Sequence, residues 1–135
     1  NDSHVEVAPG ATFYFGARGG VTVDRGATLT AIGTATEPVV FTGVDEVPGS
    51  WLGLLTRDAA LHLERAEVSW AGADRVGFAG NVLITGVRTT QTSYVGRSLL
   101  RGSAGCGLYA NSATVDFLEI EENEYVDNFN DECVP

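Results

Sequence analysis

Three side chains suited to acid–base chemistry lie close together near the middle of the chain. They are His62, Glu64 and Glu67, and hydrolysis of a glycosidic bond needs two carboxyl groups at separations of about 5 to 10 Å. Apolar and polar residues alternate from Leu61 to Glu64, which places His62 and Glu64 on the outer face of one strand. These three residues are the catalytic candidates. An ordinary surface role is the favoured interpretation, because polar side chains on outer faces usually have no catalytic function.

The acidic C-terminal segment carries the oxygen chemistry that calcium prefers. Residues 116–132 contain eight acidic residues and no basic residue, and Asp127, Asn130 and Asp131 could supply carboxylate and amide oxygens to calcium. The segment has neither the twelve-residue loop of helical calcium sites nor the glycine–aspartate nonapeptide of calcium-binding β-rolls. A solvated acidic surface is therefore favoured over a metal site, and no cofactor is expected.

Composition restricts the classes of function. The chain has 135 residues, 44% of them hydrophobic, which is enough for one domain over residues 1–135 with a single core. A formal net charge of −10 repels nucleic-acid phosphates, and no apolar run reaches the roughly 18 residues of a membrane-spanning helix. Because the sequence begins at Asn1 rather than Met, we expect a mature or excised piece of a longer chain.

The elements that must position these side chains are short strands. Segments such as Val5–Val7 and Val21–Val23 alternate with period two, whereas no helical apolar spacing is sustained. Residues 5–13 and 21–29 also repeat one another at a constant offset of 16. A constant offset favours a solenoid of parallel coils, in which each residue stacks on its own copy, over a sandwich of hairpins. Further strands are predicted at residues 39–41, 51–55, 61–63, 67–70, 82–84, 98–100, 107–109, 114–117 and 118–120.

Three stretches carry a specific coil pattern: Gly26–Thr34 (GATLTAIGT), Glu37–Thr42 (EPVVFT) and Pro48–Trp51 (PGSW). They resemble the Leu-x-Ala-x-Gly-Thr, Pro-Ile-x-Phe-Thr and Gly-Asp-Trp-Gly-Gly segments of secreted right-handed parallel β-helix proteins of the pectate-lyase-like superfamily. Ser50 and Leu52 replace the aspartate and glycine usual in the last segment. The resemblance implies an all-β fold, a right-handed parallel β-helix of about six coils with little or no helix.

Glycine and asparagine are expected at the corners of such coils. Gly10, Gly26 and Gly33 fall where the backbone turns sharply, and glycine adopts left-handed geometry at low cost. Asn123 and Asn128 are similar to an Asn-x-Phe-x-x-Asn corner of the same superfamily, and their amides are expected to bond to backbone groups. We interpret these five residues as structural, in preference to a polar ligand site.

Cys106 and Cys133 are 27 residues apart, close to the length of one long coil. Stacked coils would bring them within reach of a disulfide that closes the last turn, and two free buried thiols are the alternative. A disulfide is typical of an exported protein, as the resemblance to secreted proteins also implies. We therefore expect an extracellular or cell-envelope location.

The quoted motif residues are structural, so they support a fold more than an activity. Enzymes of the resembled superfamily cleave acidic polysaccharides, whereas this chain is short for an enzyme groove. The favoured hypothesis is a non-catalytic extracellular or cell-surface module for structural display or for binding a glycan or protein. The alternative is a small polysaccharide-active lyase or hydrolase, or a remnant of one. Bare strand edges at the ends of a solenoid also predict self-association.

Overall fold

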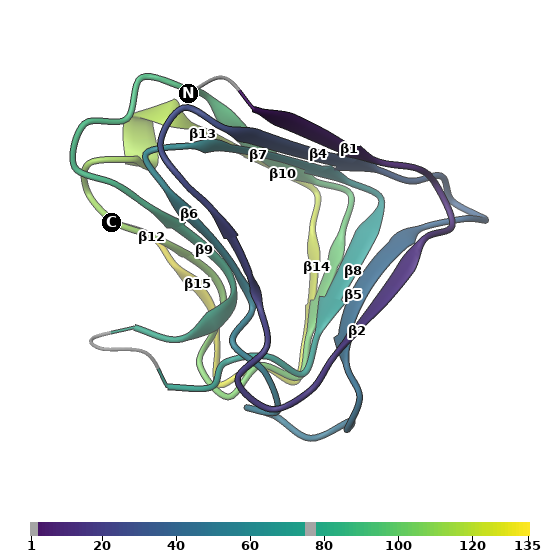
Figure 1. The fold of residues 1–135 in the computed structure, drawn as a ribbon. Helices are drawn as coiled ribbons and strands as arrows, with labels where there is room; N and C mark the ends of the chain where they lie inside the picture. Colours follow the sequence, from purple (N-terminus) through teal and green to yellow (C-terminus); the bar gives the residue numbers. More distant parts are fainter. Residues whose placement is uncertain (1–2, 75–77) are drawn as a thin grey trace.

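The strands of the computed structural model, which describes residues 3–74 and 78–135, form three parallel sheets with a triangular cross-section (Figure 1). Sheet A contains, in spatial order, β1 (His4–Val7), β4 (Thr28–Ile32), β7 (Ala60–Glu64), β10 (Ser93–Gly96) and β13 (Leu118–Glu121). Sheet B contains β2 (Thr12–Phe15), β5 (Val39–Gly43), β8 (Ala66–Ser69), β11 (Leu99–Arg101) and β14 (Glu124–Val126). Sheet C contains β3 (Val21–Val23), β6 (Leu54–Arg57), β9 (Gly80–Thr85), β12 (Cys106–Ala110) and β15 (Asn130–Cys133).

The chain passes through sheets A, B and C in turn and completes five coils. This confirms the prediction of an all-β parallel solenoid, with five coils where about six were expected. The coils differ in length: Thr28 lies 24 residues beyond its partner His4, but Leu54 lies 33 residues beyond its partner Val21. Long turns such as residues 44–53 lengthen individual coils.

The repeat in the sequence relates two sides of the triangle rather than two stacked coils. Val5 lies in β1 of sheet A, whereas its copy Val21 lies in β3 of sheet C. The residue that pairs with Val5 in the next coil is Leu29. The expectation that each residue stacks on its own copy is therefore wrong, because the repeated unit is one strand, one glycine turn and a second strand.

Alternate side chains of every sheet point inward and form ladders that fill the interior. Buried members of these ladders are Ala31, Leu63 and Val95 on sheet A, Phe41, Val68 and Leu100 on sheet B, and Leu54, Val82 and Leu108 on sheet C. Burying one large apolar side chain contributes roughly 1.5 to 3 kcal/mol. Apolar stacking between coils is thus the main stabilising interaction of the fold.

The predicted glycine turns have two different physical causes. Gly10 and Gly26 have φ angles of 85° and 82°, in the left-handed region that glycine enters at low cost. At Gly33 the cause is close approach, because an added Cβ would lie 2.5 Å from the carbonyl oxygen of Arg65 and 2.7 Å from Cα of Pro38. Any larger residue at position 33 would push two coils apart.

Residues 114–117, predicted as a strand, instead turn the chain at the start of the last coil. Val115–Phe117 form a short 3-10 helix, and the hydroxyl of Thr114 donates to the carbonyl oxygen of Ile84 at 3.1 Å. A buried hydroxyl bonded to the coil below fixes this turn.

Within the described residues, no helix has the length and apolar character that crossing a membrane requires.

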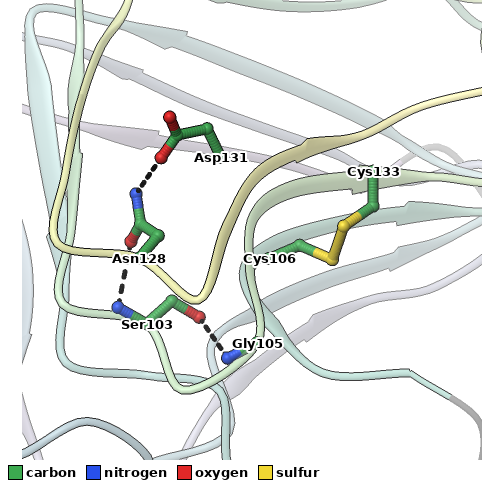
Figure 2. The surroundings of a disulfide bond; sticks show 6 residues. All are labelled: Ser103, Gly105, Cys106, Asn128, Asp131 and Cys133. Atoms are coloured by element: carbon green, nitrogen blue, oxygen red, sulfur yellow. Dashed lines mark hydrogen bonds between the residues drawn. A yellow bond between two sulfur atoms is a disulfide. The ribbon is translucent and has the colours of Figure 1, made fainter.

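Asn123 and Asn128 join the last coil to the preceding one at two corners. Oδ1 of Asn123 accepts the N–H of Ser98 at 3.1 Å, and its Nδ2 donates to the carbonyl oxygen of Val95 at 2.9 Å. Oδ1 of Asn128 accepts the N–H of Ser103 at 2.9 Å in the same way (Figure 2). Each amide therefore satisfies backbone groups that a turning strand leaves without a sheet partner.

A disulfide joins Cys106 of β12 to Cys133 of β15, which are neighbouring strands of sheet C (Figure 2). The two Cα atoms are 6.0 Å apart, within the range that a disulfide spans. The predicted pairing is confirmed. The bond ties the last described coil to the coil before it.

Candidate functional site

The corner between sheets A and B separates the predicted catalytic residues. His62 and Glu64 lie on β7 of sheet A, whereas Glu67 lies on β8 of sheet B. Arg65 between these strands has a φ of 50°, a left-handed conformation that redirects the chain from one sheet to the next. The structure therefore brings His62 and Glu64 to one face of the molecule and places Glu67 on another.

Arg97 links the carboxylates along this corner. Its guanidinium lies 3.7 Å from Glu64 Oε2, 3.6 Å from Glu121 Oε1 and 3.7 Å from Glu122 Oε1. Attraction to Tyr94 and to these carboxylates raises the pKa of Arg97. Arg97 thereby holds Glu64 as one of its ion-pair partners.

The Tyr94 side chain extends over Gly96 on the outer face of sheet A. A Cβ added at Gly96 would collide with the Tyr94 ring, so the ring covers the backbone of that glycine. The Tyr94 hydroxyl donates to Glu121 Oε1 and accepts from Arg97 Nη1, both at 2.9 Å. Desolvation raises the pKa of Tyr94, and its hydrogen bond to Glu121 raises it further. The hydroxyl therefore stays protonated at neutral pH.

A shallow depression of about 350 Å³ lies beside this ring, lined by Ile32, His62, Glu64, Thr92, Tyr94 and Glu119. Nε2 of His62 lies 3.0 Å from the carbonyl oxygen of Thr92. Because a carbonyl oxygen only accepts, this contact is a hydrogen bond when Nε2 carries the proton. The depression thus combines one aromatic surface with an imidazole and two carboxylates. We call it the sheet A face.

Glu67 belongs to a second polar cluster, on sheet B. Its Oε2 lies 3.1 Å from Arg101 Nη2 and 3.1 Å from Ser69 Oγ. The guanidinium carbon of Arg101 lies 5.6 Å from the centre of the Trp70 ring, a cation–π distance. Glu67 is thereby engaged by neighbours on its own sheet and does not share the depression with Glu64.

Asp58 is a buried carboxylate at the corner between sheets C and A, with an exposed fraction of 9%. Its Oδ1 accepts the N–H groups of Val87 at 2.8 Å and Arg88 at 2.9 Å, and Arg25 Nη2 lies 3.6 Å from Oδ2. The Arg88 N–H lowers the pKa of Asp58 most. The Val87 N–H and Arg25 lower this pKa further, against the opposing effect of burial. The carboxylate fixes the turn that follows β9.

The C-terminal acids do not gather into a metal centre within the described residues. No group of three His, Cys, Asp or Glu side chains placed to hold a metal occurs in residues 3–74 and 78–135. Oδ1 of Asp131 lies 3.5 Å from Nδ2 of Asn128 (Figure 2), while Asp127 occupies a left-handed corner with a φ of 56° and Asn130 begins β15. Most of these acids lie exposed along the last coil.

Tyr94, Arg97 and Asp58 are not among the site residues predicted from the sequence. For Tyr94 a local signal exists, because Ser93–Gly96 alternates like a strand and places glycine two residues after the aromatic. No local pattern reveals the other two, since Glu121 and the backbone of Val87 lie more than twenty residues from the side chains that they contact.

Comparison of the chain with models of protein families, with curated proteins and with solved structures gives no significant match. The functional argument therefore depends on the site itself.

Proposed function

We propose that this chain is a non-catalytic binding module of an exported protein, and that the sheet A face receives a glycan or protein partner. One observation carries the proposal: the Tyr94 ring extends over Gly96 and shares a depression with His62 and Glu64. A tyrosine ring offers an apolar surface with a polar end, a combination enriched where proteins bind partners. Its neighbours supply hydrogen-bond donors and acceptors around that surface.

The arrangement of the carboxylates supports binding rather than hydrolysis. A hydrolase needs two carboxyl groups converging on one bond, whereas the two carboxylates predicted from the sequence, Glu64 and Glu67, belong to different sheets. Glu119 also lines the depression with Glu64, so this separation concerns the predicted pair. Each also lies beside an arginine, Arg97 for Glu64 and Arg101 for Glu67. Side chains held in ion pairs are suited to presenting a fixed polar surface.

Export is supported by the disulfide between Cys106 and Cys133, because such bonds persist in oxidising compartments. The resemblance of Gly26–Thr34 and Glu37–Thr42 to secreted parallel β-helix proteins points the same way. We therefore place the module outside the cell or in the cell envelope, where it displays a rigid lateral face or forms a rigid segment of a larger protein.

The second candidate function is a small polysaccharide-active enzyme. It is favoured by the shared depression of His62 and Glu64, in which an imidazole and a carboxylate face the same solvent region. General acid–base catalysis uses these side-chain types. In this alternative Glu64 would act on the substrate and Glu67 would have no direct part, so a single carboxylate variant distinguishes the two functions.

Binding is tested on a glycan array and against extracellular proteins, with Tyr94→Ala compared with Phe129→Ala. Phe129 is a matched control, since it is an aromatic residue with 79% exposure that lies outside the sheet A face. We expect Tyr94→Ala to weaken binding by about tenfold or more, because aromatic anchors dominate interface energetics, and Phe129→Ala to bind like the wild type.

Turnover is measured in parallel by the release of reducing sugars and of unsaturated products. The proposal predicts no turnover by the wild type. If the wild type cleaves a polysaccharide and Glu64→Gln abolishes that cleavage, the chain is an enzyme and the binding-module proposal is wrong. If Tyr94→Ala binds the partner as tightly as the wild type, the sheet A face is not the binding site.

A further inference from the structure

The depression of the sheet A face combines apolar surface with two carboxylates. Ile32, which is 46% exposed, and the Tyr94 ring supply the apolar surface, while Glu64 and Glu119 supply the charged groups. These four residues come from four neighbouring strands of one sheet, β4, β7, β10 and β13. A side chain with an apolar stem and a cationic end complements such a surface, and arginine and lysine have this composition.

The register of the strands places one carboxylate on each side of Tyr94. Glu119 pairs with Tyr94 itself, and Glu64 pairs with Gly96. The Tyr94 hydroxyl lies over Gly96, because a Cβ added there would collide with it. Neighbouring strands of a sheet are about 4.8 Å apart. A group that contacts the Tyr94 ring is therefore within reach of both carboxylates.

Both carboxylates can accept further hydrogen bonds. The exposed side chain of Glu119 forms no ion pair and no hydrogen bond within residues 3–74 and 78–135. Glu64 lies 3.7 Å from Arg97, which also lies 3.6 Å from Glu121 and 3.7 Å from Glu122. These distances are longer than a hydrogen bond. A closer cationic donor would therefore form charge-assisted hydrogen bonds that the chain itself does not supply to this depression.

The charges on the strands of sheet A favour a positively charged partner. These strands contain four glutamates, one in β1, one in β7 and two in β13, and they contain no arginine. The strands of sheets B and C, in contrast, include Arg101 and Arg57. The formal net charge of the chain is −10. Complementary charge steers a partner toward a surface and excludes partners of like charge.

The chain holds one of its own guanidinium groups by the same combination of an aromatic ring and a carboxylate. On sheet B, the guanidinium carbon of Arg101 lies 5.6 Å from the centre of the Trp70 ring, and its Nη2 lies 3.1 Å from Glu67 Oε2. Arginine suits this combination better than lysine, because its planar group presents several donors in a fixed fork and also stacks on aromatic rings.

We propose that the partner of the sheet A face is a protein that inserts an arginine side chain into the depression between Glu64 and Glu119. The inference rests on the proposed binding function and adds the chemistry of the partner. The methylene groups of this arginine pack against Ile32 and Tyr94, and its guanidinium donates to the two carboxylates. A neutral or acidic glycan as the partner would contradict this assignment.

Fluorescence anisotropy with labelled peptides tests the charge of the partner. Three peptides share one design, in which glycine and serine separate residues of arginine, citrulline or glutamate. Citrulline resembles arginine in shape but has an uncharged urea group. We expect the full chain to bind the arginine peptide about tenfold or more tightly than the citrulline peptide, and not to bind the glutamate peptide.

Glutamine variants locate the binding on the sheet A face. Glu46→Gln is the matched control for Glu64→Gln and Glu119→Gln, because Glu46 is exposed on the turn between β5 and β6 and its loss changes the net charge equally. We expect each of the other two variants to weaken binding of the arginine peptide by about threefold or more, and the double variant by about tenfold. Glu46→Gln should bind like the wild type, and thermal melting checks that each variant is folded.

Charge reversal gives a test that a folding defect cannot imitate, because it predicts a gain. Glu119→Arg is expected to bind the glutamate peptide, whereas Glu46→Arg is not. The proposal is wrong if the wild type does not bind the arginine peptide, if Glu46→Gln weakens binding as much as Glu119→Gln, or if both reversed variants bind the glutamate peptide equally.

The same measurements separate this proposal from the proposed function. If the arginine peptide does not bind but Tyr94→Ala weakens binding of a glycan, the sheet A face is a binding site and only the arginine partner is wrong. If Tyr94→Ala changes the binding of no glycan, protein or peptide, both proposals are wrong.

Discussion

At the scale of single residues, polar side chains at the corners between the sheets bond to backbone groups. Asn81 shows how: its Oδ1 accepts the N–H of Ala71 at 3.0 Å, and its Nδ2 donates to the carbonyl oxygen of Arg101 at 3.1 Å. Asn123 and Asn128 make equivalent bonds in the last coil. Burying an amide fully in this position costs little free energy, because both of its polar atoms form hydrogen bonds with backbone groups.

Asp58 leads to a prediction about pH. Its pKa is lowered from the ordinary value of 3.8, so the folded state favours the carboxylate. The stabilisation is fully present above the unfolded pKa and is lost as pH falls through the lowered pKa. We expect Asp58→Asn to reduce the free energy of unfolding by roughly 2 kcal/mol at neutral pH. This difference from the wild type should shrink below about pH 4.

Asp24→Asn is the control for Asp58→Asn in urea titrations over a pH series. Asp24 also pairs with an arginine, Arg57, but both side chains are more than half exposed, so its loss should change stability little. A destabilisation by Asp58→Asn that is equally large at pH 3 and pH 7 would show that the ionised carboxylate is not what holds the turn after β9.

Residues at the corners also show what can be predicted from sequence. Gly10 and Gly26 are identifiable because a glycine turn repeats in the sequence, and Asn123 with Asn128 because their spacing resembles a known coil corner. Tyr94 and Arg97 act through contacts with Glu121, in the next coil. Contacts between coils depend on the register of stacking. The pattern of residues along the sequence does not reveal that register when coil lengths vary.

At the scale of elements, the sequence predicts apolar strands better than polar ones. Val39–Phe41 and Val82–Ile84 lie within strands β5 and β9, whereas Ser93–Gly96, Glu124–Val126 and Asn130–Cys133 are strands that the sequence analysis does not predict. These strands are short and carry polar residues. Their conformation is set by backbone pairing with the coil below, which overrides the weak intrinsic preference of such residues.

The disulfide between β12 and β15 leads to a prediction about the last coil. Replacing both cysteines, as Cys106→Ser with Cys133→Ser, frees a loop of 27 residues in the unfolded chain. The chain-entropy model gives a loss of roughly 3 to 4 kcal/mol for a loop of this length. We expect a lower melting temperature, together with faster amide exchange in β13, β14 and β15 than in β4, β5 and β6.

Reduction of the wild-type protein is the control for the double serine variant, because it breaks the bond without changing any residue. Both samples should show the same melting temperature and the same loss of protection in the last coil. An unchanged exchange pattern in β15, with the bond broken, would mean that apolar contacts such as those of Leu118 and Ile120 hold the last coil without help from the disulfide.

At the scale of the whole molecule, the parallel architecture gives the proposed binding surface its geometry. It places a continuous lateral surface on sheet A, where Tyr94 and His62 lie in one outward ladder.

The most direct test of this account is a nuclear Overhauser spectrum of the isotopically labelled protein. The fold predicts inter-strand contacts typical of parallel pairing that connect Thr30 to His62, His62 to Tyr94 and Tyr94 to Glu119 in one ladder. Short contacts between the Hα atoms of facing residues, which mark antiparallel strands, would contradict the solenoid. The proposed sheet A face would then lose the geometry from which it is inferred.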